Sequence, residues 1–310
     1  IMKKQLLTAT LATSLLFSQA PVHAAENEND NEGEIKEEVF TYGHDLSPEQ
    51  KEETEQLLDV GKNVKQVDVD VDDVRSFTNT TYQGIYSSAS IKPKSFGSGV
   101  DVEIVNPENI TDVSKAQYMN AAISAGIKNA DIKIGAVVNT LGYGALTGIY
   151  QAYKEEGNDL NQEDINNASN ELETLSNISK NHADDPNYSD GAMNNAVADM
   201  KGQAAKEEKK QEDVSDDTIR SIVDDVLKDK QLDNVINGDE KTQITNIIIN
   251  TAQSDAVKND PDSFIDQTNH LKSKVSDAIE KGKHIDKEEA SKEAEGFLSK
   301  TWNWIKGLFS

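Results

Sequence analysis

The sequence predicts an α+β (or α/β) domain over residues 44–154, with about four strands and three helices, followed by an acidic all-α helical bundle over residues 155–310. Two patterns indicate this division. Valines alternate with aspartates over residues 64–71, the period of two that is typical of a strand with one dry and one wet face. After residue 155, apolar residues instead recur at the spacing of amphipathic helices.

Residues 1–24 carry the features of a cleavable secretory signal peptide. Lys3 and Lys4 precede an uncharged apolar run over residues 6–17, and His23 lies between small or apolar residues before the expected cut between Ala24 and Ala25. The alternative is an uncleaved anchor, but this run is shorter than the roughly 20 residues of a membrane-spanning helix. We therefore expect a secreted protein, or one on the extracellular face of the cell envelope, with no transmembrane span after signal removal.

The α+β domain is expected to follow a disordered acidic leader over residues 25–43, because Glu, Asn, Asp and Gly dominate residues 25–40 and cannot bury a core. A helix then begins at Ser47, a good N-cap with Pro48 at the first helical position and Gln50 placed for a capping box, and it ends near Gly61. Strands are predicted over residues 64–71, 89–94, 100–105 and 132–138, and two further helices over residues 114–125 and 142–153.

The second half reads as a series of slim amphipathic helices that end in an amphipathic C-terminal helix. Ser215 is placed to cap one of them. The apolar positions expected to face the core are Ile165, Ala168, Leu172, Leu175, Ile178, Met193, Val197, Met200, Ala204, Ile219, Ile222, Val223, Val226, Leu227, Ile244, Ile247, Ile248, Ala252, Phe264, Leu271, Val275 and Ile279.

Three segments together resemble a known family. They are residues 46–50 (LSPEQ), residues 97–110 (GSGVDVEIVNPENI) and residues 119–153, which contain AAISAGI and ALTGIYQAY. In order and spacing they resemble the YpuA-like exported proteins of Gram-positive bacteria, the family of domain of unknown function 1002. The resemblance covers most of residues 46–154 and, more loosely, the helical remainder. It implies export and a similar architecture, and it implies no activity.

Charge and composition exclude several classes of function. The chain has 56 acidic and 31 basic residues, for a net charge of −25, and it has no cysteine. Such a surface repels nucleic acid and anionic lipid. Without cysteine there is no disulfide framework, thiol nucleophile or thiolate zinc site. The remaining motifs indicate no cofactor and no catalytic residues.

One candidate site lies at Gly142, Tyr143 and Gly144, between a predicted strand and a predicted helix, where backbone N–H groups can hold an anion or a peptide terminus. The spacing to Gly148 does not match the dinucleotide fingerprint, so close helix–strand packing is the alternative. A second candidate is a cation site at Asp68, Asp70 and Asp72, which share one face if residues 64–71 form a strand. No calcium loop accompanies them, and a solvated strand face is the alternative.

The C-terminal segment is the most unusual part of the sequence, because both tryptophans of the chain lie in it. Its aromatic and aliphatic side chains fall on one broad helical face that suits a membrane interface or a partner, while closure of the helical core is the alternative. The residues of this face are Phe297, Trp302, Trp304, Ile305, Leu308 and Phe309.

The sequence therefore predicts an exported, non-enzymatic binding or interaction module of the cell envelope or extracellular space. It identifies no partner, although export makes a cell-wall or other envelope component the candidate. The alternatives are a hydrolase of envelope polymers that uses unidentified carboxylates, and a peripheral membrane protein that docks through residues 297–309.

Overall fold

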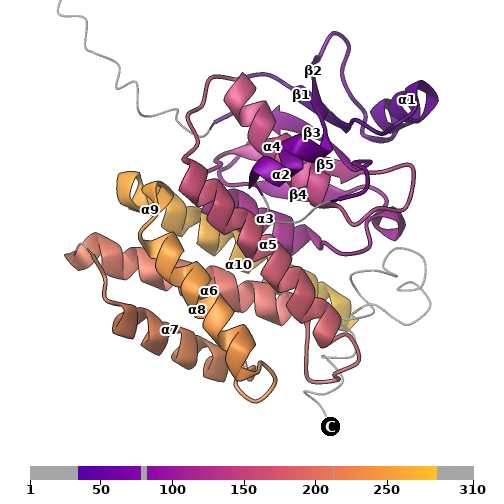
Figure 1. Ribbon diagram of the computed structural model, residues 1–310. Helices are drawn as coiled ribbons and strands as arrows, with labels where there is room; N and C mark the ends of the chain where they lie inside the picture. The colour runs from indigo at the N-terminus through magenta and orange to yellow at the C-terminus, as the bar shows by residue number, and fades with distance from the viewer. Residues whose placement is uncertain (1–33, 78–81, 212, 285–310) are drawn as a thin grey trace, which may run out of the picture. The chain divides into compact units, whose positions relative to one another are not determined.

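Five strands form one mixed sheet, in the order β2-β1-β3-β5-β4 (Figure 1). The computed structural model describes residues 34–77, 82–211 and 213–284, with side chains to residue 279. β1 (Val39–Gly43) pairs in parallel with β2 (Lys65–Val69) and antiparallel with β3 (Ser88–Pro93). β5 (Ala130–Gly135) pairs antiparallel with β3 and in parallel with β4 (Asp101–Ile104). β2 and β4 are therefore the edge strands.

Strand β1 corrects the prediction that residues 25–43 form a disordered leader. Val39, Phe40 and Thr41 are almost completely buried, and the strand lies inside the sheet between β2 and β3. Ile35 also joins the core. The prediction missed this strand because it follows an acidic segment and because its five residues are too few to show a clear period of two.

Helix α2 (Val71–Phe77) corrects the predicted strand over residues 64–71. The strand is present, but it ends at Val69. Asp70 Oδ1 accepts from the backbone N–H of Asp73 at 2.8 Å, and Asp73 Oδ2 accepts from the N–H of Asp70 at 2.9 Å. This reciprocal capping turns the chain into a helix before the alternating pattern is complete.

Two helices begin where they were predicted to begin, α1 with the predicted capping box. α1 (Pro48–Leu57) follows Ser47, which exchanges capping-box hydrogen bonds with Gln50. α3 (Lys115–Ser124) follows Ser114, which makes the same exchange with Gln117. The short 3-10 helix η2 (Pro107–Asn109) precedes α3.

Helix α4 (Tyr143–Glu155) covers one face of the sheet, and α1 lies on the other. Gly148 of α4 approaches Thr41 and Val69 so closely that an added Cβ would lie 2.3 Å from Thr41 Oγ1. On the opposite face, the ammonium group of Lys51 in α1 lies 3.4 Å from the centroid of the Tyr42 ring. This division follows from the alternation of side chains along each strand.

The second half of the described chain is helical, as predicted. Its elements are α5 (Gln162–Asn181), α6 (Asp190–Gln211), α7 (Asp216–Asp229), α8 (Gly238–Ala252), α9 (Asp255–Asn259) and α10 (Pro261–His284). The predicted apolar positions are buried in these helices, apart from the half-buried Ile279. Ser215 caps α7 by accepting from the N–H of Thr218 at 3.2 Å.

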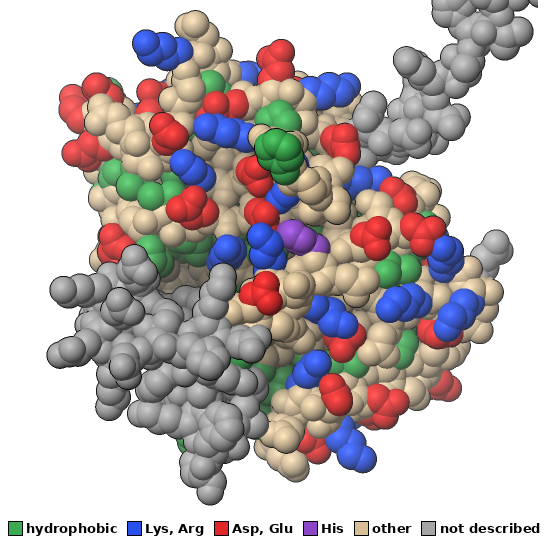
Figure 2. Space-filling view, turned by 180° about the vertical axis from the view of Figure 1, so that it is seen from behind, with side chains coloured by type: hydrophobic (Ala, Val, Ile, Leu, Met, Phe, Trp, Pro, Cys, Tyr) green, Lys and Arg blue, Asp and Glu red, His purple; other side chains and the backbone are tan. Residues whose placement is uncertain are grey.

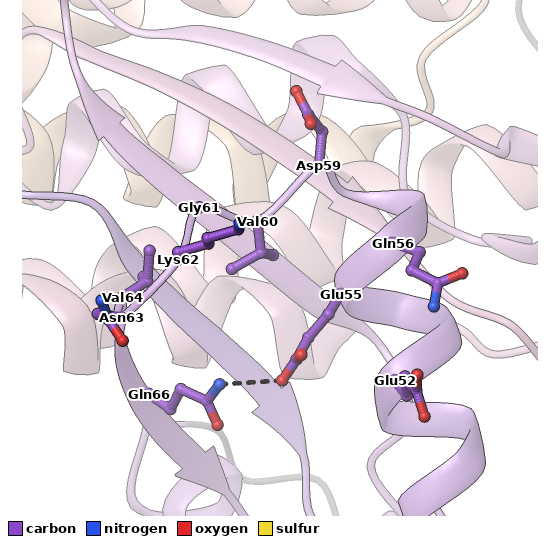
Figure 3. A pocket seen from close by; sticks show the side chains of 10 residues that line it. All are labelled: Glu52, Glu55, Gln56, Asp59, Val60, Gly61, Lys62, Asn63, Val64 and Gln66. Carbon is purple, nitrogen blue, oxygen red and sulfur yellow. Dashed lines mark hydrogen bonds between the residues drawn. The ribbon is translucent and has the colours of Figure 1, made fainter.

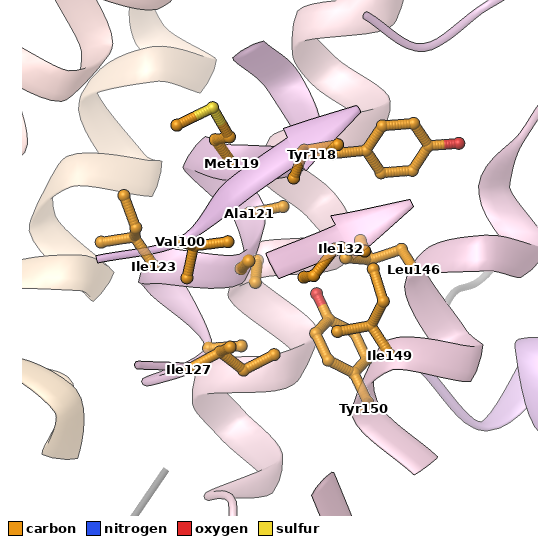
Figure 4. Packing of buried hydrophobic residues seen from close by; sticks show 14 of the residues in the cluster. Val100, Tyr118, Met119, Ala121, Ile123, Ile127, Ile132, Leu146, Ile149 and Tyr150 are labelled. Carbon is orange, nitrogen blue, oxygen red and sulfur yellow. The ribbon is translucent and has the colours of Figure 1, made fainter. Parts of the chain in front are cut away.

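One hydrophobic core extends across the boundary predicted after residue 154. Figure 4 shows part of this core, including Val100, Met119, Ile132 and Tyr150. The same core includes Phe264, Leu271 and Val275 of α10. Helix α3 joins the two halves, because it contacts β4 on one side and α5, α6 and α10 on the other.

Candidate functional site

A surface pocket of about 770 Å³ lies between α1 and the start of β2 (Figure 3). α1 and β2 form its opposite walls, and the loop that connects them closes one end. The lining residues are Glu52, Glu55, Gln56, Asp59, Val60, Gly61, Lys62, Asn63, Val64 and Gln66.

The connecting loop gives the pocket its shape. Leu58 is fully buried at the end of α1, and the chain then turns through Asp59 (φ 54°) and Asn63 (φ 59°), both in the left-handed region. Asp and Asn tolerate this conformation better than other residues with a side chain. Gln66 Nε2 of β2 donates to Glu55 Oε1 of α1 at 2.9 Å, which links the two walls.

The pocket is polar and predominantly acidic. Glu52 is exposed and Glu55 is half-buried, whereas the exposed Asp59 carboxylate lies 3.6 Å from Lys133 Nζ of β5. Lys62 is the single cationic side chain among the lining residues. Exposed carboxylates keep their hydration and attract a cation without a large desolvation penalty. The arrangement suits reversible binding of a cationic group better than proton transfer, which needs an acid and a base tuned by burial.

The buried charges of the described chain lie elsewhere. Lys201 and Glu171 are both 0% exposed, and Lys201 Nζ donates to Glu171 Oε1 at 2.9 Å. Lys201 also donates to the C=O of Asn120 at 2.9 Å and to Ser124 Oγ at 3.1 Å, and Ser124 donates to Glu171 Oε2 at 2.6 Å. This network joins α3, α5 and α6, and its ammonium group and both carboxylate oxygens are occupied by protein partners.

Three further buried carboxylates bond to backbone N–H groups. Asp164 accepts from Ala256 at 3.0 Å, Glu208 accepts from Val214 at 2.9 Å, and Glu240 closes the capping box of α8. Burial raises the pKa of Asp164 to about 6, although its hydrogen bond from Ala256 opposes the rise. Glu208 and Glu240 thus stabilise turns next to them in the chain, and Glu240 also lies 2.9 Å from His182 Nε2. Asp164 at the start of α5 instead binds the start of α9.

A cluster of ion pairs ties the sheet to α10. Asp101 of β4 pairs with Lys94, with His270 Nε2 at 3.0 Å and with Lys274 at 3.2 Å. Burial opposes ionisation of Asp101, but the hydrogen bonds from Lys94 and His270 hold its pKa well below the ordinary value. Figure 2 shows that acidic and basic side chains are interspersed on this face of the molecule.

The predicted aspartate trio does not share a strand face. Asp68 lies in β2, where its Oδ2 is 2.8 Å from His44 Nδ1. Asp70 caps α2, and Asp72 lies in the first turn of that helix, where it pairs with Arg75. Among the described residues, no group of three or more His, Asp or Glu side chains is arranged to hold a metal ion.

The predicted anion site at Gly142, Tyr143 and Gly144 is buried and closely packed. Gly142 has φ 101°, and its C=O accepts from the Tyr118 hydroxyl at 2.6 Å. The N–H of Ala145 already donates to Ser87 Oγ at 3.0 Å. The glycines thus allow the close helix–strand packing that was the alternative interpretation.

The remaining predicted sites lie outside the described residues. They are the cleavage position between Ala24 and Ala25 and the C-terminal face formed by Phe297, Trp302, Trp304, Ile305, Leu308 and Phe309. Within the part of the chain that is described, no helix is both long and apolar enough to cross a membrane.

Sequence reasoning missed the pocket between α1 and β2. Its walls lie within 15 consecutive residues, 52–66, but they are brought together by the packing of α1 on the sheet. The available signal was the density of acidic residues on α1 beside a short loop that contains Asp59, Gly61 and Asn63.

Comparison with known proteins places these features in a family. Residues 42–271, from β1 to α10, match the family described as "Protein of unknown function (DUF1002)". Over 287 residues the chain is 27% identical to "Uncharacterized protein YpuA" of Bacillus subtilis (strain 168), covering 87% of this chain and 89% of that protein. No solved structure matches. The match spans both the sheet and the helices that share its core, and the chain therefore belongs to the DUF1002 family of proteins of unknown function.

Proposed function

We propose that this protein is an exported, non-enzymatic binding protein of the cell envelope or extracellular space, and that it recognises cationic groups at the pocket between α1 and β2. In this proposal the acidic helical bundle over residues 155–310 supports the sheet that presents the pocket. The basic and apolar pattern of residues 1–24 supports export. The carboxylates of Glu52 and Glu55, on the α1 wall of an open pocket, support cation binding.

The observation that carries the proposal is the separation of the pocket from the buried charges. A carboxylate-based hydrolase needs an acid and a base that face one cavity, with at least one of them tuned by burial. Here the pocket carboxylates are exposed or half-buried, whereas Glu171, Asp164, Glu208 and Glu240 bond to Lys201 or to helix ends. This distribution favours a binding protein over the hydrolase alternative.

The binding proposal is tested by titrating the full chain with the polyamine spermine and following backbone amide shifts by NMR. The largest shifts are expected around residues 52–66. The double variant Glu52→Gln/Glu55→Gln should weaken binding about three- to tenfold, the effect of losing two charge contacts at the surface. Because a chain of net charge −25 attracts any polycation, the matched control is Asp216→Asn/Asp217→Asn, which removes two exposed charges from α7.

Equal weakening by the two double variants would show only general charge attraction and would refute a site at the pocket. The compartment is tested separately, by mass spectrometry of the native protein from washed cells and from the medium. The expected N-terminal residue is Ala25, and recovery of Met2 on cytosolic protein would refute export.

A further inference from the structure

The pocket adjoins the unpaired edge of strand β2, and this edge indicates which kind of ligand the pocket could bind. Within the described part of the chain, β2 has one neighbouring strand, β1, and its other edge is unpaired. Gln66 and Asp68 of this strand are exposed. An unpaired edge carries a row of backbone donors and acceptors that an extended peptide can use.

The pairing with β1 fixes which backbone groups are free. The C=O of Val69 accepts from the N–H of His44 at 2.9 Å, so the backbone of Val69 is directed toward β1. Backbone groups alternate in direction along a strand, which directs those of Gln66 and Asp68 toward the open edge. The N–H of Asp70, where the strand ends, is already occupied by Asp73. The free edge is therefore short and centred on two residues.

The side chains beside this edge are those of the pocket. Gln66 points to the face of the sheet that carries α1, where it meets Glu55. Glu52 and Gln56 of α1 line the same pocket (Figure 3). A strand added along β2 would direct every second side chain toward this flank of α1. The backbone edge and the acidic wall can thus be engaged by one extended segment.

We propose that the ligand is an extended basic polypeptide segment that adds to the sheet as a sixth strand beside β2, with alternate Lys or Arg side chains directed toward Glu52 and Glu55. This inference rests on the proposed function and specifies its ligand. Backbone hydrogen bonds supply affinity that does not depend on sequence, while the acidic wall selects for positive charge. Lys65 does not block the edge, because its ammonium group binds Glu155 and the C=O of that residue on α4.

The probe for this proposal is an eight-residue peptide of alternating Lys and Thr, compared with the same peptide N-methylated at every second residue. N-methylation keeps the charge and removes alternate backbone donors. The unmodified peptide should bind the full chain about fivefold or more tightly, the effect of one or more net hydrogen bonds. An alternating Glu and Thr peptide should not bind measurably.

Position 66 offers a matched pair of variants. Gln66→Pro removes an outward N–H from an edge strand, a place where proline is tolerated, and it also removes the side-chain contact with Glu55. Gln66→Ala removes only the contact. Binding of the Lys–Thr peptide should fall about fivefold in Gln66→Pro relative to Gln66→Ala. Because the peptide comparison uses the native chain, the test holds even where Gln66→Pro unfolds.

The outcomes distinguish the binding proposal from the strand-addition proposal. Spermine binding at the pocket, together with equal affinity for the two Lys–Thr peptides, would leave the proposed function standing and overturn strand addition. Absence of binding by spermine and by both peptides would overturn both. A dimer of the peptide-free chain that Gln66→Pro dissociates would identify a second copy as the occupant of the edge, and it too would overturn the basic-peptide proposal.

Discussion

Replacing either member of the buried Lys201–Glu171 pair should destabilise the protein severely. Both side chains are fully buried, and the pair is held by hydrogen bonds to Asn120 and Ser124. Lys201→Met leaves the Glu171 carboxylate with Ser124 as its remaining donor, and Glu171→Leu leaves an ammonium group without a counter-charge. Breaking a buried pair in this way costs about 3–5 kcal/mol in the free energy of unfolding.

The double variant Glu171→Leu/Lys201→Met should lose much less free energy of unfolding than the sum of the losses in the two single variants. It leaves no buried charge, and its main loss is the hydrogen bonding of Asn120 and Ser124, about 1–3 kcal/mol. The coupling energy between the two positions should therefore exceed about 3 kcal/mol. The assay is urea unfolding followed by circular dichroism, with the slope of the transition compared between variants to verify a common mechanism.

An exposed ion pair provides the control for this experiment. Lys209 and Asp262 pair at 2.5 Å with side chains 48% and 72% exposed, and they link α6 to α10. Lys209→Met should change stability by less than about 1 kcal/mol. Two results would refute the conclusion that the buried charges stabilise the fold as a pair. One is a loss of less than about 1 kcal/mol in the single variants of Lys201 and Glu171, and the other is a loss in the double variant equal to the sum of the two single losses.

Three further predictions test other parts of the fold. Because its pKa is raised, Asp164 binds a proton more tightly in the folded state, and its contribution to the free energy of unfolding falls as pH rises from about 4 to 6. Over that range Asp164→Asn should gain about 1–2 kcal/mol relative to the native chain, a value discounted for screening. Urea unfolding at several pH values measures this difference, and parallel pH profiles of the two chains would contradict it. Gly148→Ala should lower the free energy of unfolding by about 1–3 kcal/mol because its Cβ meets Thr41, whereas Gly238→Ala, with open space around it, should be neutral or stabilising; equal melting temperatures would contradict the packing. Ser114→Ala should cost about 1 kcal/mol through the cap of α3, measured by thermal unfolding, and no loss would show that the cap is dispensable.

The sequence predicted elements whose signals are local. The capping residues Ser47 and Ser114 mark the starts of α1 and α3 because their hydrogen bonds involve only the next three residues. The apolar positions of α5 to α8 were also correctly predicted, since helical periodicity extends over many residues. α1 ends earlier than predicted: the left-handed residue that follows its C-cap is Asp59, whereas the prediction relied on Gly61.

The missed features depend on contacts that local patterns do not encode. β1 is short and follows an acidic segment, and it is recognisable as a strand only from its position between β2 and β3. The buried position of Lys201 depends on Glu171 and Asn120 meeting it from two other helices. The pocket, likewise, requires α1 to lie on the sheet beside β2. β1 and the Lys201 network have no signature within their own segments, and the only local signal for the pocket is the density of acidic residues on α1 beside its loop.

The attachment of α10 to the sheet has a consequence for how the molecule assembles. Asp101 and His270 are 169 positions apart in the chain, and α10 also covers part of α3. Because synthesis on the ribosome begins at the amino end, β4 and α3 are made long before α10, the helix that packs against them. The core can close only when nearly the whole chain is present, and a fragment cut before Pro261 would expose apolar surface to water and to other chains.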